Sequence, residues 1–214
     1  MEQVPEASVV VFEPRAVRSP AGPRLGRKAP RMTPGRAALV ELMERYLAGL
    51  LDPFISLLEV HKLMYFMQEA GEPLKLRVAK GPYGPYAENL RHVLHEIEGY
   101  NIAGYGAGGD EPDKPLELVP GAIEDARKVL AARQATRRRL ERVAELVAGF
   151  ESPPGLELLA TVHWVMTREN ATTDQEIAAL TYAWADRKKQ FSPRQLLLTR
   201  AVLMERGWVP GLKH

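Results

Sequence analysis

Apolar residues recur at helical spacing through most of the chain, and the densest run lies between residues 57 and 67. Large apolar side chains fall close enough together there for a helix that is buried on more than one side: Leu57, Leu58, Leu63, Met64, Phe66 and Met67. We expect this helix to begin at Asp52-Pro53 and to end at Ala70-Gly71, because Pro73 prevents it from resuming. The run predicts the centre of the core.

The period then changes from helical to alternating. Leu74, Leu76 and Val78 are separated by Lys75 and Arg77, which is the pattern of a strand with one buried face. We expect this strand to pair with a second short strand at 116–118, where two leucines again alternate with a polar residue.

A stiff aromatic turn follows in the segment 81–86, which has the sequence GPYGPY. The prolines fix φ, and the glycines permit turns that a side chain would block. Two interpretations stay open for Tyr83 and Tyr86. Either they contact a partner, or one of them buries its ring and hydrogen-bonds to the turn.

The rest of the chain is predicted to be largely helical. Apolar spacing and capping residues indicate helices over about 33–50, 90–97, 121–132, 135–150 and 155–167, and two more that begin at Thr173 and Ser192. The fold class is therefore predicted as mainly α with a small β-sheet (α+β). We expect a compact helical domain with winged-helix-like elements in its last three helices.

Composition narrows the classes of protein. With 214 residues and 45% hydrophobic content, the chain can bury a sizeable core. It has no cysteine, which excludes disulfides and thiolate chemistry and suits a reducing cytoplasm. No motif for a nucleophile, a phosphate loop or a dinucleotide site occurs, and His92, His95 and Glu96 lack the further ligand that a metal site needs. We expect no enzyme activity, cofactor or metal in this chain.

Charge is arranged in blocks. The overall net charge of +2 combines a basic segment at 1–36 with a folded part that is slightly acidic. Residues 88–125 hold nine acids against two bases, net −7, and residues 127–142 hold seven bases against one acid, net +6. Blocks of this kind often belong to binding faces.

Four segments together resemble a known family: KLMYFMQEAGEPL at 62–74, GPYGPYAENL at 81–90, ELLATVHWV at 157–165 and the terminal Gly207-Trp208. They are similar to the C-terminal domain of DarG-type antitoxins, which neutralise the DNA ADP-ribosyltransferase toxin DarT, and to the broader Panacea-type antitoxin domains. The resemblance covers about residues 33–208, and GPYGPYAENL is its most specific part.

The resemblance implies a domain organisation. In DarG-type proteins a macrodomain with ADP-ribosyl-DNA glycohydrolase activity precedes the toxin-binding domain. Residues 1–14, with the apolar run Val9–Phe12, are therefore expected to be a remnant of that macrodomain's last strand, 15–32 a flexible linker rich in proline and glycine, and 33–209 the antitoxin domain. We expect a cytoplasmic protein that is a monomer alone and binds the DarT toxin 1:1, without contact to a membrane.

The implied partner suggests a mechanism. An enzyme that captures single-stranded DNA needs a cationic groove and room for stacked bases. Carboxylates could stand in for phosphates, and tyrosines could occupy base positions. The residues expected to contact the toxin are Tyr83, Tyr86, Glu88, Glu96, Glu98, Tyr100, Tyr105, Asp110, Glu111 and Asp113.

An alternative is a winged-helix-like nucleic-acid-binding regulatory module. It would use the Arg137-Arg138-Arg139 helix together with the C-terminal helices. Against it, the folded part is net negative, and an arginine-rich helix face is usually only solvated. The antitoxin interpretation expects no direct binding to nucleic acid.

Overall fold

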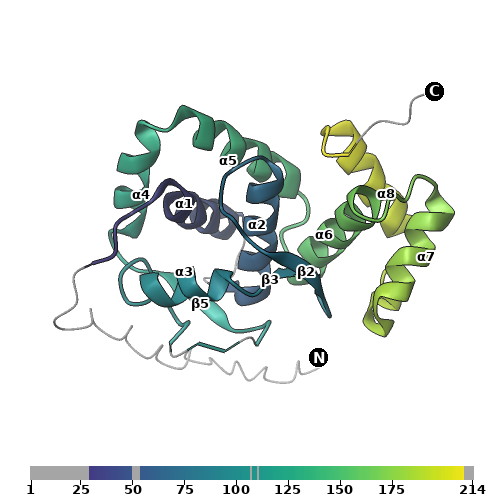
Figure 1. Cartoon of the computed structure of the whole chain (residues 1–214), viewed down its shortest axis with the longest axis horizontal. Coiled ribbons are helices and arrows are strands. Elements are labelled where there is room, and N and C mark those ends of the chain that lie inside the picture. The colour runs from purple at the N-terminus through teal and green to yellow at the C-terminus, as the bar shows by residue number, and fades with distance from the viewer. Residues whose placement is uncertain (1–28, 50–53, 107, 110, 210–214) are drawn as a thin grey trace, which may run out of the picture.

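The computed structural model describes residues 29–49, 54–106, 108–109 and 111–209, and helix α2 (Leu57–Glu69) lies at its centre (Figure 1). All residues of this helix from Leu57 to Met67 are buried, as predicted. Its expected start at Asp52-Pro53 is wrong. Ser56 caps the helix in a box with Glu59, and the strand just before the cap is extended backbone. Residues 52–53, and the expected remnant and most of the linker at 1–28, lie outside the described residues.

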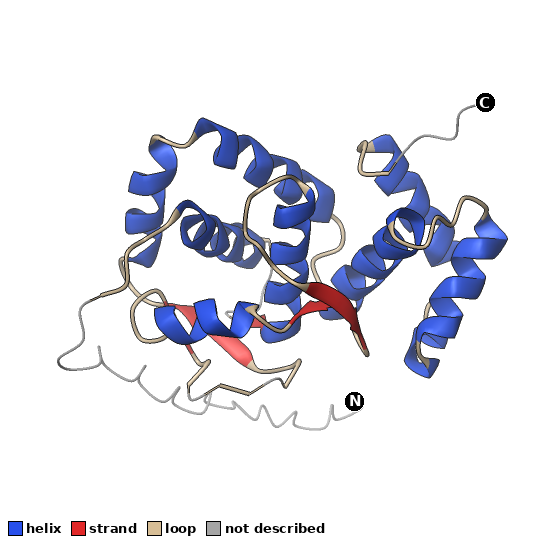
Figure 2. Cartoon of the chain, in the orientation of Figure 1, coloured by secondary structure: helices blue, strands red, loops and turns tan. Residues whose placement is uncertain are grey.

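Helices make up most of the described fold (Figures 1 and 2). Besides α2 they are α1 (Pro34–Ala48), α3 (Leu90–Ile97), α4 (Ala122–Ala131), α5 (Gln134–Val147), α6 (Pro153–Thr167), α7 (Asp174–Trp184), the short 3-10 helix η1 (Asp186–Gln190) and α8 (Pro193–Glu205). Helices α1, α5 and α6 pack against α2, whereas α7 and α8 pack against α6. The predicted helices are confirmed to within a few residues. The capping boxes at Thr173 and Ser192 are also present, so local signals fixed these helix ends.

Five short strands form two small sheets in the described part of the chain. Strands β1 (Ile55–Ser56), β5 (Pro115–Leu118) and β4 (Ile102–Ala103) pair antiparallel in the order β1-β5-β4. Strands β2 (Val78–Gly81) and β3 (Gly84–Ala87) form a separate hairpin. No strand follows Leu118 within residues 119–209, so the winged-helix likeness is limited to helices.

The predicted strand at 74–78 and its pairing with 116–118 are wrong. Lys75 has a φ of +59°, which breaks an extended strand. Side-chain amides form the hydrogen bonds to the backbone N–H and C=O groups that a neighbouring strand would otherwise form. Gln68 bonds both the N–H and the C=O of Leu76, and Asn89 bonds the N–H of Arg77 and the C=O of Lys75. The segment is therefore an irregular loop tied down by amides.

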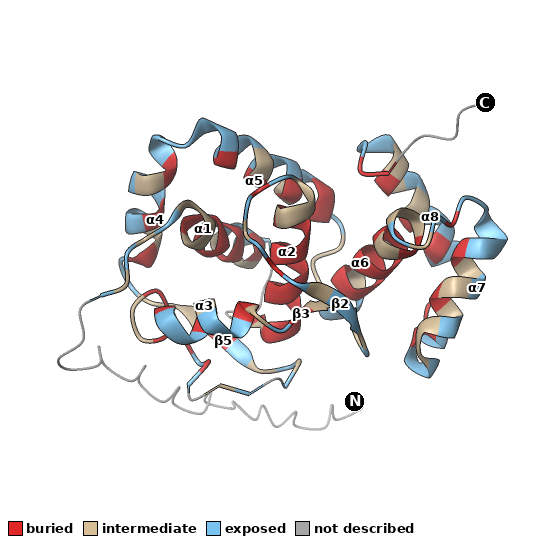
Figure 3. Ribbon diagram, viewed as in Figure 1, coloured by how far each residue is buried: buried red, intermediate tan, exposed pale blue. Residues whose placement is uncertain are grey.

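The interior contains an aromatic cluster where α2 meets α6 and the C-terminal segment (Figure 3 shows both helices as mostly buried). The Tyr65 hydroxyl lies 2.6 Å from Nδ1 of His163, and the Phe66 ring packs edge-on against Trp208 at 5.5 Å. Burial lowers the pKa of His163 to about 4. The position of His163 between Val162 and Trp164 in an apolar run predicts a hydrogen-bonded core histidine, and the structure confirms this. Tyr65 and Phe66 also belong to the core.

Candidate functional site

The GPYGPY segment forms the β2–β3 hairpin, and a glycine lets it pack tightly. Gly84 has a φ of +101°, and a Cβ built there would lie 2.9 Å from the Thr161 hydroxyl on α6. Both the backbone conformation and the close approach therefore require glycine. The turn residues Pro82 and Tyr83 extend beyond this contact point.

Two long side chains from distant parts of the chain hold the hairpin by its carbonyl oxygens. Lys62 on α2 donates to the C=O of Pro85 at 2.6 Å, and Trp184 at the end of α7 donates to the C=O of Gly81 at 2.8 Å. The hairpin is thereby fixed to helices on both sides of it. Such a scaffold loses little conformational freedom when a partner binds.

A buried ion cluster lies beneath the hairpin. Glu157 on α6 is 1% exposed and accepts hydrogen bonds from Arg187 at 3.0 and 2.9 Å and from Lys188 at 2.6 Å. Lys188, itself fully buried, also donates to the Thr161 hydroxyl at 3.0 Å. Burial alone would raise the pKa of Glu157, but the hydrogen bonds from Arg187 and Lys188 lower it overall. Glu157 therefore stays ionised and compensates both cations.

Two neighbouring basic side chains on α2, His61 and Lys62, have pKa values well below their ordinary ones. Burial, then the charge of Lys188, lowers the pKa of Lys62 to about 7, although Glu157 acts in the opposite direction. Burial, then the charge of Lys62, lowers the pKa of His61 to about 3. His61 is consequently neutral at physiological pH, whereas the pKa of Lys62 lies close to physiological pH.

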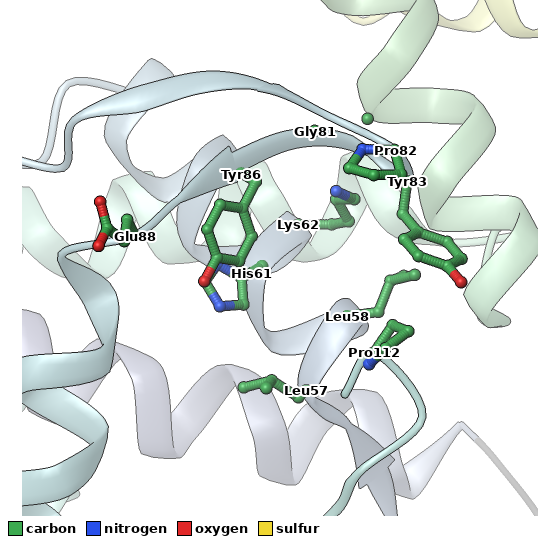
Figure 4. A pocket seen from close by; sticks show the side chains of 11 residues that line it. Leu57, Leu58, His61, Lys62, Gly81, Pro82, Tyr83, Tyr86, Glu88 and Pro112 are labelled. Carbon is green, nitrogen blue, oxygen red and sulfur yellow. The ribbon is translucent and has the colours of Figure 1, made fainter. Parts of the chain in front are cut away.

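Each tyrosine of the hairpin packs against a basic side chain: Tyr86 lies over His61 (Figure 4), and Tyr83 packs against Arg187. The Tyr86 ring stacks on His61 with centroids 4.4 Å apart and an interplanar angle of 24°. The Tyr83 ring receives the Arg187 guanidinium at 4.0 Å from its centroid, a cation–π contact. Both tyrosines remain partly exposed, so each ring offers an edge or a face to the surface while its position is fixed from below.

Two hollows meet at Tyr83. The first, of about 350 Å³, lies between the hairpin, the start of α2 and Pro112, and both tyrosines and Glu88 line it (Figure 4). The second, of about 830 Å³, shares Tyr83, Leu58 and Pro112 with the first and is lined further by Glu111 and Asp113. The structure thus places two tyrosine rings and three exposed carboxylates, those of Glu88, Glu111 and Asp113, around adjoining depressions. The second hollow is also lined by the less exposed acids Glu59, Glu151 and Glu157 and by Arg187.

Three known proteins are similar in sequence to most of this chain. The chain is 39% identical over 210 residues to a DNA ADP-ribosyl glycohydrolase of Thermus aquaticus, an alignment that covers 97% of this chain and 56% of that protein. It is 37% identical over 203 residues to the proteins of the same name from Mycobacterium tuberculosis and Mycobacterium bovis, covering 87% of this chain and 56% of each relative. The chain is homologous to part of the DNA ADP-ribosyl glycohydrolases.

This homology confirms the resemblance to DarG-type proteins. No family model matches the chain. The chain spans little more than half the length of the curated glycohydrolases that it matches. What the whole relatives do is therefore not by itself a property of this part.

The other residues expected to contact a partner are spread more widely over the fold. Glu96 is exposed on α3 and pairs with Arg36. Tyr100 is half-buried. Glu98 is 9% and Tyr105 3% exposed, and the Glu98 carboxylate accepts from the backbone N–H of Tyr105 at 3.1 Å. The Glu98 carboxylate is thus used in a contact with the backbone, and the side chains of Glu98 and Tyr105 present little surface. Asp110 lies outside the described residues.

Sequence reasoning missed the residues that fix the hairpin in place, namely Lys62, Glu157, Trp184, Arg187 and Lys188. One signal was available: Glu157 is a single acid inside an otherwise apolar helix, and a buried carboxylate requires a cation. Which cation compensates it is not visible from the spacing, because Arg187 and Lys188 lie about thirty positions away on η1.

Part of the basic block at 127–142 is used within the fold. Arg139 donates to Glu72 at 2.7 Å. Arg142 donates to the C=O of Gly207 at 2.7 Å and lies over the Trp208 ring. These contacts attach α5 to the loop after α2 and to the C-terminal segment. Arg137 and Arg138 are exposed.

The described residues contain no group of three histidine or acidic side chains placed to hold a metal ion. Among the same residues, no helix has the length and apolar character required to span a membrane.

Proposed function

We propose that this chain is the toxin-binding part of a DarG-type antitoxin, and that it inhibits a DNA ADP-ribosyltransferase of the DarT class by occupying its DNA-binding groove. The observation that carries the proposal is the grouping of Tyr83, Tyr86, Glu88, Glu111 and Asp113 around two adjoining hollows. The homology supplies the biological context, DNA ADP-ribosylation.

The physical basis is imitation of single-stranded DNA. A groove that binds single strands follows the phosphates with positive charge and stacks the bases on flat surfaces. The side chains of Glu88 and Glu111 are 64% and 67% exposed, and their ion pairs with Arg91 and Lys114 are surface pairs of small energy. Their charge is therefore available to a cationic partner. The tyrosines are held rigidly next to these acids, as bases are held next to phosphates.

We assign the glycohydrolase activity named in the relatives to the part of those proteins that this chain does not cover. The chain itself would then act stoichiometrically, as a monomer that binds one toxin molecule in the cytoplasm, without a cofactor. Incubating the chain with ADP-ribosylated DNA tests this assignment. Release of ADP-ribose by the chain alone would refute it.

Charge reversal at the grouped acids tests the antitoxin function directly. The triple variant Glu88→Lys, Glu111→Lys and Asp113→Lys should lose binding to the toxin and inhibition of DNA ADP-ribosylation by at least about 100-fold, because close interfacial charge pairs turn into repulsions. The matched control is Glu124→Lys, Glu141→Lys and Glu205→Lys. It changes the net charge equally at exposed positions on α4, α5 and α8. Equal inhibition by both triple variants would end the mimicry proposal.

A direct nucleic-acid-binding function predicts a different result. Electrophoretic mobility shifts with single- and double-stranded DNA should show no complex at micromolar concentrations of the chain. Binding that depends on Arg137 and Arg138 would instead favour the regulatory-module alternative.

A further inference from the structure

The 350 Å³ hollow beside the hairpin has the size of a pocket for one ring-shaped group (Figure 4). Its walls are mostly apolar and come from three separate places in the chain: Leu57 and Leu58 at the start of α2, Pro82 in the hairpin turn, and Pro112 before β5. The rings of Tyr83 and Tyr86 complete the walls. Nothing in the acidic surface described above requires such a hollow.

The polar groups of the pocket suit a flat, uncharged occupant. His61 is neutral at physiological pH, and its Nδ1 has no hydrogen-bond partner among the described residues. Lys62 already donates to the C=O of Pro85. The stacked pair of Tyr86 and His61 presents π-systems against which another ring can pack in an offset or edge-on arrangement. A phosphate or carboxylate would have to displace water from mostly apolar walls and approach Glu88.

The exposed charges at and next to the pocket are mainly acidic. Glu88 lines the pocket, and Glu111 and Asp113 line the adjoining hollow on the other side of Tyr83 and Pro112. Of the two cations in these walls, Lys62 is buried and Arg187 is paired with Glu157. These carboxylates favour an entering side chain that has a positively charged residue next to it. The proposed DNA-like surface likewise requires a positively charged partner.

We propose that this pocket receives an aromatic side chain of the toxin, carried next to a basic residue that pairs with Glu88. The inference rests on the proposed function and adds a protein-specific anchor to it. Interface energy concentrates in aromatic side chains that fill preformed pockets near carboxylates or other polar rims. Mimicry of DNA would thus supply charge attraction, and the pocket would supply selectivity for the cognate toxin.

Filling the pocket without changing any charge tests the inference. Pro112 and Pro120 each occupy the second position of a turn, closed by the N–H of Lys114 to the C=O of Glu111 at 3.1 Å and by the N–H of Ala122 to the C=O of Val119 at 3.0 Å. Pro112→Trp would place an indole in the mouth of the pocket. Pro120→Trp makes the same substitution at an exposed turn away from it.

We expect Pro112→Trp to weaken toxin binding by at least about 30-fold, the loss typical of a removed hot spot, and Pro120→Trp to bind like the wild type. Unchanged urea midpoints in both variants would show that they fold. If Pro112→Trp binds the toxin as tightly as Pro120→Trp, the pocket inference is overturned while the antitoxin function stands. If the wild-type chain does not bind the toxin, the proposed function itself fails.

A second measurement does not need the toxin. Titration of the isotope-labelled chain with 4-methylphenol, the side chain of tyrosine, should give saturable shifts at the amides of Gly81 and Gly84. These shifts should persist in Pro120→Trp and disappear in Pro112→Trp. Absence of saturable shifts in the wild type, or equal shifts with adenine, would contradict a pocket that prefers an aromatic side chain.

Discussion

The buried Glu157 carboxylate compensates the fully buried Lys188 and the more exposed Arg187, and we expect the stability of the hairpin region to depend on it. Removing one partner of a buried ion pair leaves the other charge uncompensated, which costs far more than the net energy of the intact pair. Lys188, which is fully buried, would be left in that state. The individual residue thus has consequences well beyond its own contacts.

Glu157→Ala should therefore lower the free energy of unfolding by about 3–5 kcal/mol, measured by urea denaturation. Glu145→Ala, at an exposed position on α5, is the control and should change it by less than about 0.5 kcal/mol. The double variant Glu157→Leu with Lys188→Met should recover much of the loss, since it removes both charges. A double variant no more stable than Glu157→Ala would argue against uncompensated charge as the cause.

His61 makes stability depend on pH. Its folded pKa of about 3 lies below the ordinary value of 6.5, so the unfolded chain binds the proton more readily between these values. Stability is therefore fully present above pH 6.5 and is lost as the pH falls toward 3. From pH 6.5 to 4.5 we expect this residue to account for a loss of about 2 kcal/mol. His61→Phe keeps a ring under Tyr86 and should reduce that acid sensitivity in urea titrations at the two pH values. An unaltered pH dependence would show that His61 does not titrate in this way.

At the same scale, the sequence predicted single residues unevenly. His163 was assigned correctly to the core because Val162 and Trp164 flank it in a mostly apolar helix. Glu157 lies on the same helix, but its compensating cations come from η1. A contact between residues that lie far apart in the chain leaves no periodic trace.

Among the elements, the β2–β3 hairpin depends most on its surroundings. It is a short two-stranded unit, which is marginal in isolation. Here it is held by hydrogen bonds from Lys62 and Trp184 and by the close approach of Gly84 to α6. Its conformation is therefore a property of the helices that flank it.

Gly84→Ala should destabilise the protein by about 2–3 kcal/mol, because the alanine would be strained at a positive φ and its Cβ would also clash with Thr161. The control is Gly121→Ala. Gly121 has a φ of +87° but no atom within 4 Å of an added Cβ, so only the strain of about 1 kcal/mol applies. Urea unfolding measures both. Equal losses would mean that the contact with α6 adds nothing.

Element prediction succeeded where the information was local. The helices were found because apolar periodicity and caps such as Thr173 and Ser192 are written into adjacent residues. A strand was predicted at 74–78 because apolar and polar residues do alternate there. The segment is not a strand, because the side chains of Gln68 and Asn89 form the hydrogen bonds to its backbone that a neighbouring strand would form. The turn of the hairpin at 78–87 was predicted correctly. The strand before the turn was expected to pair with 116–118, but β2 pairs with β3 instead.

For the whole molecule, the distribution of charge determines how a partner approaches. The acidic block at 88–125 contributes the exposed carboxylates near the two hollows, whereas the basic block at 127–142 lies on α4 and α5. Opposite faces of one small protein can therefore present opposite fields. The sequence predicted the blocks, but only the fold shows which acids gather beside the tyrosines and which, like Glu98, are internal.

Toxin association should be sensitive to salt. Raising the salt concentration from 50 to 500 mM should lower the association rate constant by about 10-fold or more and change the dissociation rate much less, because screening acts on long-range steering. Stopped-flow mixing measures both constants. The triple Lys variant at Glu88, Glu111 and Asp113 should lose this salt dependence. Association of the wild type that is independent of salt would exclude electrostatic steering by this surface.

The two tethers of the hairpin have a practical consequence for inhibitor design. Lys62 and Trp184 lie on helices that are separated by more than half of the described chain. A synthetic peptide that copies residues 81–90 would carry both tyrosines and Glu88 but neither anchor, and it should sample many shapes in solution. If the chain is the proposed inhibitor, a minimal version would have to transplant α2 and α7, which carry the two anchors, together with the turn and with α6, on which the hairpin packs. The smallest transferable unit is therefore close to the domain itself.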